Sequence, residues 1–158
     1  MVKNLRLIVP ALVLAVIAGV LVLSQDPEPL GSGGCKEKYK ADVAVRVGSQ
    51  TIRAEQAISA QQQRIGLSGR ACIGHDQGML FAFEKPGQYS FWMKDMYFPI
   101  DIIWMDADRK VIAIEKNVSP STYPDSFVNK DKSAKYVLEL KANRSDSLGI
   151  KLGTKVNF

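Results

Sequence analysis

The sequence has 158 residues, a length that accommodates one domain plus an appendage and excludes a two-domain enzyme. Its 46% hydrophobic and 23% charged residues are those of an ordinary globular protein, which excludes a disordered, collagen-like or disulfide-dense chain. The formal net charge is +5, and residues 130–158 contribute +4 of it. The basic side chains there are spaced singly between acidic ones, which favours a solvated face over contact with anionic lipids or nucleic acid.

The N-terminal segment carries a long apolar run, Leu7–Leu23, without a charged or hydrogen-bonding side chain. As a helix it would cover about 26 Å, which nearly spans a bilayer core. Lys3 and Arg6 precede the run, whereas Asp26 and Glu28 follow it. The charge asymmetry predicts a single-pass anchor in the cell membrane, with the N-terminus cytoplasmic and the rest of the chain extracytoplasmic.

Two other interpretations of this run remain. A cleaved signal peptide would leave a secreted domain, although Val22 and Ser24 make a weak cleavage site. A buried soluble helix would show one polar face, which the run lacks. The residues that follow hold two prolines and three glycines, so the predicted divisions are an anchor or signal at 1–24, a flexible linker at 25–35 and a single domain at 36–158.

The elements expected in the domain are mostly strands. Alternating valines at 43, 45 and 47, the turn residues Gly48 and Ser49, and the stretch Gln50–Ala54 predict a β-hairpin. Ser59 and Gln62 form a capping-box pattern for a short helix over residues 60–67. Further strands are expected over residues 79–84, 89–94, 136–140 and 155–158, with a hairpin over 100–116 that turns at 106–109 and a polar surface loop over 119–133. The prediction is a mainly β domain, a compact sandwich or barrel with one short helix, preceded by an N-terminal transmembrane helix.

Several kinds of chemistry lack the residues that they need. One histidine, His75, and two cysteines cannot supply a four-ligand zinc site, and His75 lies in a turn-like sequence typical of an exposed loop. The chain has no glycine loop of the phosphate-binding types. We therefore expect no metal, no cofactor and no nucleic-acid partner.

Two carboxylates stand inside apolar strands. Strand alternation places Asp101 beside Ile103 and Met105, and Glu139 is embedded in Tyr-Val-Leu-Glu-Leu. A carboxylate in such a setting needs a cation or hydrogen-bond donors, because burying it unpaired costs several kcal/mol. We expect Asp101 to be buried and paired with Lys94 or Arg70. The candidate polar cluster is therefore Arg70, Lys94, Asp101 and Glu139.

Aromatic and cysteine residues give two further candidates. Trp92, Tyr97 and Trp104 lie near the embedded charges in sequence and would floor a binding cleft, the alternative being core packing. Cys35 and Cys72 would form a disulfide in an oxidising compartment. The alternative is a free thiol at Cys35 and a small buried side chain at Cys72.

Five short motifs follow one another along the domain. They are Gly66–Arg70 (GLSGR), Gly78–Phe83 (GMLFAF), Phe91–Asp95 (FWMKD), Pro99–Ile103 (PIDII) and Val137–Leu140 (VLEL), with Gly153 near the end. From about Val43 to Phe158 their succession resembles the prokaryotic domain of unknown function 192 family. The resemblance implies a compact β-rich domain, often exported or membrane-anchored, and implies no known activity. Two positions depart from the family pattern, with Ser68 where methionine is usual and Asn143 where glycine is usual.

The expected function is that of a non-enzymatic extracytoplasmic domain, monomeric and tethered to the membrane through Leu7–Leu23. It would bind a small molecule, a glycan or an envelope partner. The alternative is a hydrolase or lyase that uses Asp101 and Glu139 as a carboxylate pair beside Lys94 and Arg70. A catalytic pair would have to face one solvent-accessible pocket, whereas structural carboxylates would be sealed beneath other side chains.

Overall fold

The computed structural model describes Cys35 and residues 38–158. The predicted anchor at Leu7–Leu23 and the linker up to Cys35 lie outside the described residues. Within the described part of the chain, no helix is long and apolar enough to cross a membrane.

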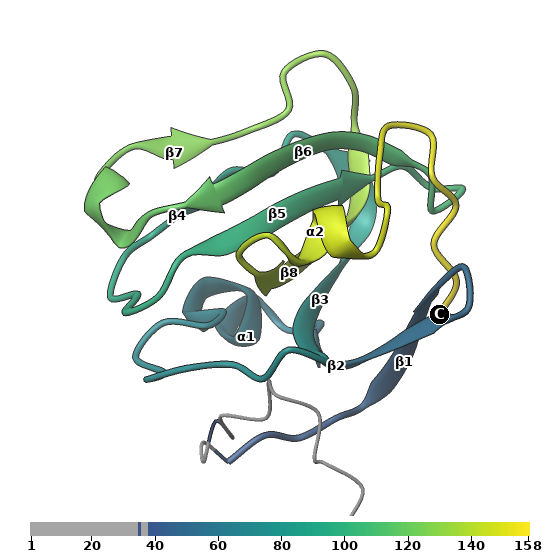
Figure 1. Ribbon diagram of the computed structural model, residues 1–158. Helices are drawn as coiled ribbons and strands as arrows, with labels where there is room; N and C mark the ends of the chain where they lie inside the picture. Colours follow the sequence, from purple (N-terminus) through teal and green to yellow (C-terminus); the bar gives the residue numbers. More distant parts are fainter. Residues whose placement is uncertain (1–34, 36–37) are drawn as a thin grey trace, which may run out of the picture.

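The described residues form a mainly β domain, as predicted from the sequence (Figure 1). Its elements are β1 (Val43–Val47), β2 (Gln50–Ala57), α1 (Ala60–Ile65), β3 (Gln77–Gly87), β4 (Phe91–Trp92), β5 (Ile100–Met105), β6 (Val111–Val118), the 3-10 turn η1 (Pro120–Thr122), β7 (Ser126–Phe127), β8 (Ala134–Lys141) and α2 (Arg144–Ser147). Six strands make one mixed sheet in the order β1-β2-β3-β8-β5-β6, in which only β2 and β3 are parallel. Strands β4 and β7 pair separately.

Local sequence signals located several of these elements correctly. The first hairpin and the hairpin formed by β5 and β6 were predicted. The capping box of α1 is present, because the Ser59 hydroxyl accepts from the Gln62 amide and the Gln62 side chain accepts from the Ser59 amide. The helix ends earlier than expected, with Gly66 as its C-cap residue.

Other expected elements differ from the structure. The strand expected over residues 89–94 is reduced to β4, because the chain turns at Met93–Met96 and Asp95 has a positive φ of 56°. The strand expected over residues 155–158 is replaced by isolated bridges from Asn157 to Arg46 and from Lys155 to Lys110. The short helix α2 was not predicted, because its four residues carry no apolar period.

The sheet has a separate apolar core on each face. One core contains Phe81, Ile102, Trp104 and Val137, and residues of the segment after α1 and around β4 cover it. The other contains Leu80, Ile103, Leu138 and Leu140, and it is covered by Leu148 after α2 and by the C-terminal segment. Neighbouring residues of β3, β5 and β8 therefore face different cores, as strand alternation requires.

The C-terminal segment connects the two ends of the sheet. At one end, the Val111 amide donates to the Thr154 carbonyl and the Val156 amide donates to the Arg109 carbonyl. At the other end, Asn157 exchanges two backbone hydrogen bonds with Arg46 of β1. Figure 1 shows the C-terminus beside the β1–β2 hairpin. The core that contains Leu138 is thus enclosed by the curved sheet and by this last segment.

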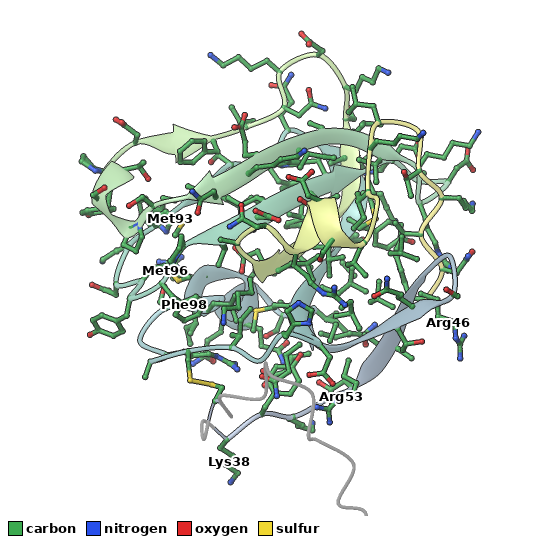
Figure 2. All side chains as sticks on the ribbon, viewed as in Figure 1. Lys38, Arg46, Arg53, Met93, Met96 and Phe98 are labelled. Atoms are coloured by element: carbon green, nitrogen blue, oxygen red, sulfur yellow. A yellow bond between two sulfur atoms is a disulfide. The ribbon has the colours of Figure 1, made fainter. Side chains whose placement is uncertain are left out.

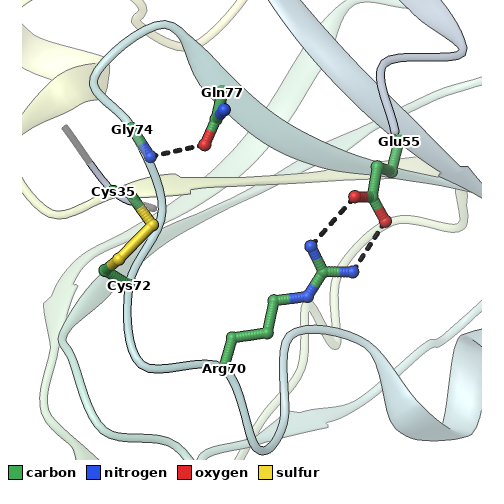
Figure 3. The surroundings of a disulfide bond; sticks show 6 residues. All are labelled: Cys35, Glu55, Arg70, Cys72, Gly74 and Gln77. Carbon is green, nitrogen blue, oxygen red and sulfur yellow. Dashed lines mark hydrogen bonds and ion pairs between the residues drawn. A yellow bond between two sulfur atoms is a disulfide. The ribbon is translucent and has the colours of Figure 1, made fainter. Parts of the chain in front are cut away.

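A disulfide attaches the end of the linker to the domain (Figure 3). Cys35 and Cys72, the two cysteines expected to pair, have Cα atoms 5.7 Å apart and are separated by 37 residues in the sequence. Closing a loop of this length stabilises a fold by about 3–4 kcal/mol in the chain-entropy treatment. The point at which the chain enters the domain is therefore held covalently.

Candidate functional site

Glu139 lies in β8, at the centre of the six-stranded sheet. It pairs with Met79 of β3 on one side and with Ile102 of β5 on the other. Its side chain is 5% exposed, and among the described residues its Oε2 atom has no hydrogen-bond partner. A buried polar atom without a partner is uncommon in folded proteins, so the surroundings of this oxygen are a candidate functional site.

Glu139 lines an open pocket of about 110 Å³. The wall is made of residues from α1 and the turn after it, from β3, and from β4 and the residues on either side of it: Gln63, Arg64, Ile65, Gly66, Leu67, Ser68, Phe81, Phe83, Tyr89, Ser90, Phe91, Trp92 and Met96. Five of these side chains are aromatic, and Glu139 is the only acidic one among the described lining residues, so its carboxyl group lies in a ring-lined hollow that also has polar side chains. Figure 2 shows Met93, Met96 and Phe98 gathered at the same end of the molecule as β4.

Gly66 allows the wall to approach Glu139 closely. It has a φ of +53°, a conformation that side-chain-bearing residues rarely adopt. A Cβ atom there would lie 3.4 Å from the Phe81 ring and 3.9 Å from Glu139 Oε2. Glycine at this position therefore leaves the space beside the carboxyl group open.

The surroundings of Glu139 control its ionisation. Burial raises the pKa of the Glu139 carboxyl to about 8, and the positive charge of Arg70 opposes this effect only in part. At neutral pH the group is therefore mainly the uncharged acid. An uncharged carboxyl both donates a hydrogen bond through its O–H and accepts one through its carbonyl oxygen.

Asp101 is fully buried, as expected, but it is not paired with Lys94 or Arg70. Its Oδ1 accepts from the amides of Asn117 and Asn143 at 2.9 and 3.0 Å. Its Oδ2 accepts from the amide and the hydroxyl of Ser145 at 2.8 and 2.7 Å. Four hydrogen-bond donors, from β6, from the residue before α2 and from α2 itself, therefore stabilise the carboxylate in place of the expected cation.

The two expected cations also lie elsewhere. Arg70 forms a two-pronged ion pair with Glu55 of β2, at 2.9 Å from Nη1 to Oε1 and 2.6 Å from Nη2 to Oε2 (Figure 3). Burial opposes ionisation of Glu55, but the hydrogen bonds from Arg70 and from the Lys40 amide outweigh it and lower the pKa of the Glu55 carboxyl. Lys94 is exposed, with its Nζ 6.0 Å from the centre of the Trp92 ring. The candidate polar cluster of four residues is therefore dispersed.

The carboxylate pair on which the hydrolase or lyase alternative depends is not formed either. Asp101 pairs in the sheet with Leu140, whereas Glu139 pairs with Ile102. Adjacent positions along a strand point to opposite faces, so the two carboxyl groups face different cores and share no pocket. Both are buried, as the sequence pattern indicated, but they cannot act on one substrate.

The aromatic candidates have different environments. Trp104 is 1% exposed and belongs to the core, where its Nε1–H donates to the Tyr89 carbonyl. Trp92 is 51% exposed and lines the pocket, and its ring meets that of Tyr123 edge-on at 6.1 Å. Tyr97 is 70% exposed and does not line the pocket. Of the three, only Trp92 is placed to touch a ligand beside Glu139.

The sequence pattern did not predict the pocket as a whole. Gly66 and Phe81 were not named as site residues, although GLSGR and GMLFAF were singled out as motifs. The available signal is that these two motifs and VLEL, the motif of Glu139, occur together in the same domain, and all three contribute residues to the pocket. Among the described residues, no group of three or more His, Cys, Asp or Glu side chains is placed to hold a metal ion.

These features define a class of protein, a small mainly β domain with one buried acid in an aromatic pocket. The profile of a known family, DUF192, described as an uncharacterized ACR, matches residues 43–158. The chain belongs to this family. A search of curated proteins found no match.

Two solved structures resemble the chain. A protein of unknown function from Novosphingobium aromaticivorans DSM 12444 is 32% identical with a TM-score of 0.68, and the match covers 73% of this chain and 84% of that one. A protein from Sinorhizobium meliloti 1021, provisionally described as a transcription regulator, is 27% identical with a TM-score of 0.66, and the match covers 72% and 89% of the two chains.

The structure accounts for one of the two departures from the family pattern. Asn143 has a φ of 65°, in the left-handed region that favours glycine and that asparagine tolerates better than most residues. At the other position, the Ser68 hydroxyl donates to the Lys94 carbonyl at 2.8 Å. This bond connects the turn after α1 to the chain that follows β4.

The first prediction concerns Asp101. Replacing Asp101 with Asn exchanges one acceptor oxygen for a donor that faces backbone amides, so we expect a loss of about 3 kcal/mol in the free energy of unfolding. Urea denaturation of the protein, followed by fluorescence of the buried Trp104, measures this loss. The exposed Asp125→Asn variant is the matched control and should change stability by less than about 0.5 kcal/mol. Equal effects of the two substitutions would contradict a structural role for Asp101.

The second prediction concerns the ionisation of Glu139. The folded state holds this proton up to about pH 8, whereas a Glu in the unfolded chain loses it near its ordinary pKa of 4.5. The stabilising effect is complete below the unfolded pKa and is lost as pH rises towards the folded pKa, at about 1.4 kcal/mol for each pH unit.

Replacing Glu139 with Gln should remove this pH dependence, whereas the exposed Glu84→Gln should retain it. Denaturation at a series of pH values between about 5 and 8 gives the slope for each protein. Parallel curves for the wild type and Glu139→Gln would show that Glu139 ionises normally.

Proposed function

We propose that this protein is a non-enzymatic, membrane-tethered extracytoplasmic domain that binds a ligand in the Glu139 pocket. The observation that carries the proposal is the Oε2 atom of Glu139, which is buried, has no partner among the described residues and lines an open hollow. Leaving a buried polar atom without a hydrogen bond costs about 1–3 kcal/mol. A ligand that supplies the missing hydrogen bond recovers that energy on binding.

The shape and chemistry of the pocket support binding. Ligand sites are concave and mainly apolar, with a small number of polar groups that orient the ligand. Here the apolar part is formed by rings such as Phe81, Phe91 and Trp92. The buried polar group is Glu139, and further polar side chains line the wall. The two faces of the sheet differ in this respect, because Asp101 on the other face already has all its partners within the protein.

The composition of the pocket favours binding over hydrolysis or elimination. Glu139 is the only carboxyl group among the described residues that line it, and Arg64 and Tyr89 are the only other ionisable ones. The hydrolase or lyase alternative depended on a second carboxylate beside the first. With Asp101 on the opposite face, that second group is missing from the described part of the site.

The location is supported by three separate features. The apolar run Leu7–Leu23 has basic residues before it and acidic residues after it, which favours an extracytoplasmic domain. The disulfide between Cys35 and Cys72 is typical of proteins outside the reducing cytoplasm. Cys35 ends the linker, so the covalent attachment lies where a tethered domain would need it.

The third prediction tests ligand binding. Small fragments carrying hydroxyl, amide, amine or carboxylate groups are added to the full-length protein in detergent, and amide chemical shifts are followed by NMR. We expect at least one fragment to shift the signals of residues 63–68 and of Glu139, because these residues line one pocket. The absence of any such shift across the library would contradict the proposal.

A pair of variants in one segment provides the control. Trp92→Ala removes an exposed ring that lines the pocket, and we expect at least a tenfold loss of fragment affinity, about 1.4 kcal/mol. Tyr97→Ala removes an exposed ring outside the pocket and should leave affinity unchanged. Equal effects of both substitutions would place binding elsewhere on the protein.

A further inference from the structure

We propose that the Glu139 pocket recognises a neutral, hydroxyl-bearing ring, that is, one saccharide unit of a glycan. This inference rests on the proposed function and specifies the chemical class of its ligand. Three properties of the site support it: the kind of polar group at the inner end, the charges around that group and the exposed ring at the rim.

The inner end of the pocket suits a hydroxyl group. Glu139 Oε2 lies close to Gly66 and the Phe81 ring, so any group that reaches it leaves water for an apolar environment. Desolvating a charged group there is far more costly than desolvating a hydroxyl. A hydroxyl also matches an uncharged carboxyl on both counts, since each group donates one hydrogen bond and accepts another.

The charges near the pocket disfavour a cationic ligand. Arg64 lines the wall, Arg70 acts on Glu139 electrostatically, and Lys94 lies near the Trp92 ring. Among the described residues that line the pocket, Glu139 is the only acid. A ligand ammonium group would meet these like charges. An anionic ligand would find a positive charge at Arg64. Its own charge, however, would have to be buried beside Glu139, and a Glu139 that had lost its proton would repel it.

The uncharged side chains of the wall fit a polyhydroxylated ligand. Gln63, Ser68 and Ser90 line the pocket, and because Gln63 Nε2 donates to backbone carbonyl groups, its Oε1 is the atom left as an acceptor. The Ser68 hydroxyl donates its hydrogen bond to the Lys94 carbonyl, so its oxygen remains available as an acceptor. Ligand hydroxyl groups would therefore find neutral acceptors in the wall besides Glu139.

Trp92 supplies the flat apolar surface that a sugar ring needs. Its side chain is 51% exposed, and Tyr123 meets it edge-on. A sugar ring has an apolar face of C–H groups and an edge of hydroxyls, so it can lie on an indole while its edge points inward. The pocket, at about 110 Å³, is smaller than an engineered cavity of about 150 Å³ that holds benzene, so it would admit the edge of one ring while the rest of a glycan stays at the rim.

The experiment is a binding assay on the full-length protein in a non-glycosidic detergent. The probes are methyl α-glucopyranoside, methyl β-N-acetylglucosaminide, maltose and N,N′-diacetylchitobiose, with propylamine and propionate as charged comparisons. Saturation-transfer NMR reports binding. We expect at least one saccharide to bind with a dissociation constant on the order of 1 mM, and more tightly than either charged probe.

Two substitutions of Glu139 test the role of its hydrogen bonds. Glu139→Gln keeps a donor and an acceptor, so saccharide affinity should change by less than about threefold, whereas Glu139→Leu removes both and should weaken binding at least tenfold. Trp92→Ala should also weaken it at least tenfold, and Tyr97→Ala should not. Saccharide binding that is indifferent to both Glu139→Leu and Trp92→Ala would overturn the inference.

The other outcomes separate this inference from the proposed function. If propylamine or propionate binds in the pocket and no saccharide does, the saccharide assignment is wrong and the ligand-binding function stands. If no saccharide, charged probe or fragment binds, both are wrong.

Discussion

The hydrogen bonds to Asp101 connect three parts of the domain that are distant in sequence. One carboxylate in β5 accepts from Asn117 at the end of β6, from Asn143 after β8 and from Ser145 in α2. Both its oxygens are thereby used, so the charge is buried without a cation. Because β8 lies beside β5, these bonds also hold the end of β8 in the register that places Glu139 on the opposite face.

The two buried carboxyl groups thus have contrasting roles. Asp101 is satisfied by the protein itself, and its burial stabilises the corner at which β5, β6, β8 and α2 meet. In the neighbouring strand, Glu139 pairs with Ile102, the residue after Asp101. It therefore faces Phe81 and the pocket on the other side of the sheet, where its Oε2 has no partner among the described residues. Proteins retain buried polar groups without a partner mainly at functional sites, so Glu139 marks the candidate site.

Local features of the fold could be predicted from the sequence, whereas the partners of the buried charges could not. The capping box of α1 and the first hairpin depend on residues within a few positions of one another. The burial of Asp101 followed from strand alternation alone. Its donors lie 16, 42 and 44 residues away and are mainly backbone amides, which carry no residue-specific signal in a sequence.

The site was predictable only in part for the same reason. Glu139 and Trp92 were named from their strand context, and both line the pocket. The separation of Asp101 from Glu139 depends on the pairing of β5 with β8, which a single sequence does not specify. Arg70 was expected beside these carboxylates, but β2 supplies Glu55 as its partner, and that pairing depends on how the segment after α1 returns to the sheet.

The central claim is that Glu139 is an uncharged acid held ready for a ligand. Carbon-13 NMR of the protein labelled at glutamate carboxyl groups measures this state directly, with Glu139→Gln used to assign the signal. The burial of Glu139 predicts a titration midpoint of about 8, well above that of the exposed glutamates. A midpoint close to the ordinary glutamate pKa of 4.5 would contradict the claim, because it would show that the carboxyl group is solvated or paired in the folded protein.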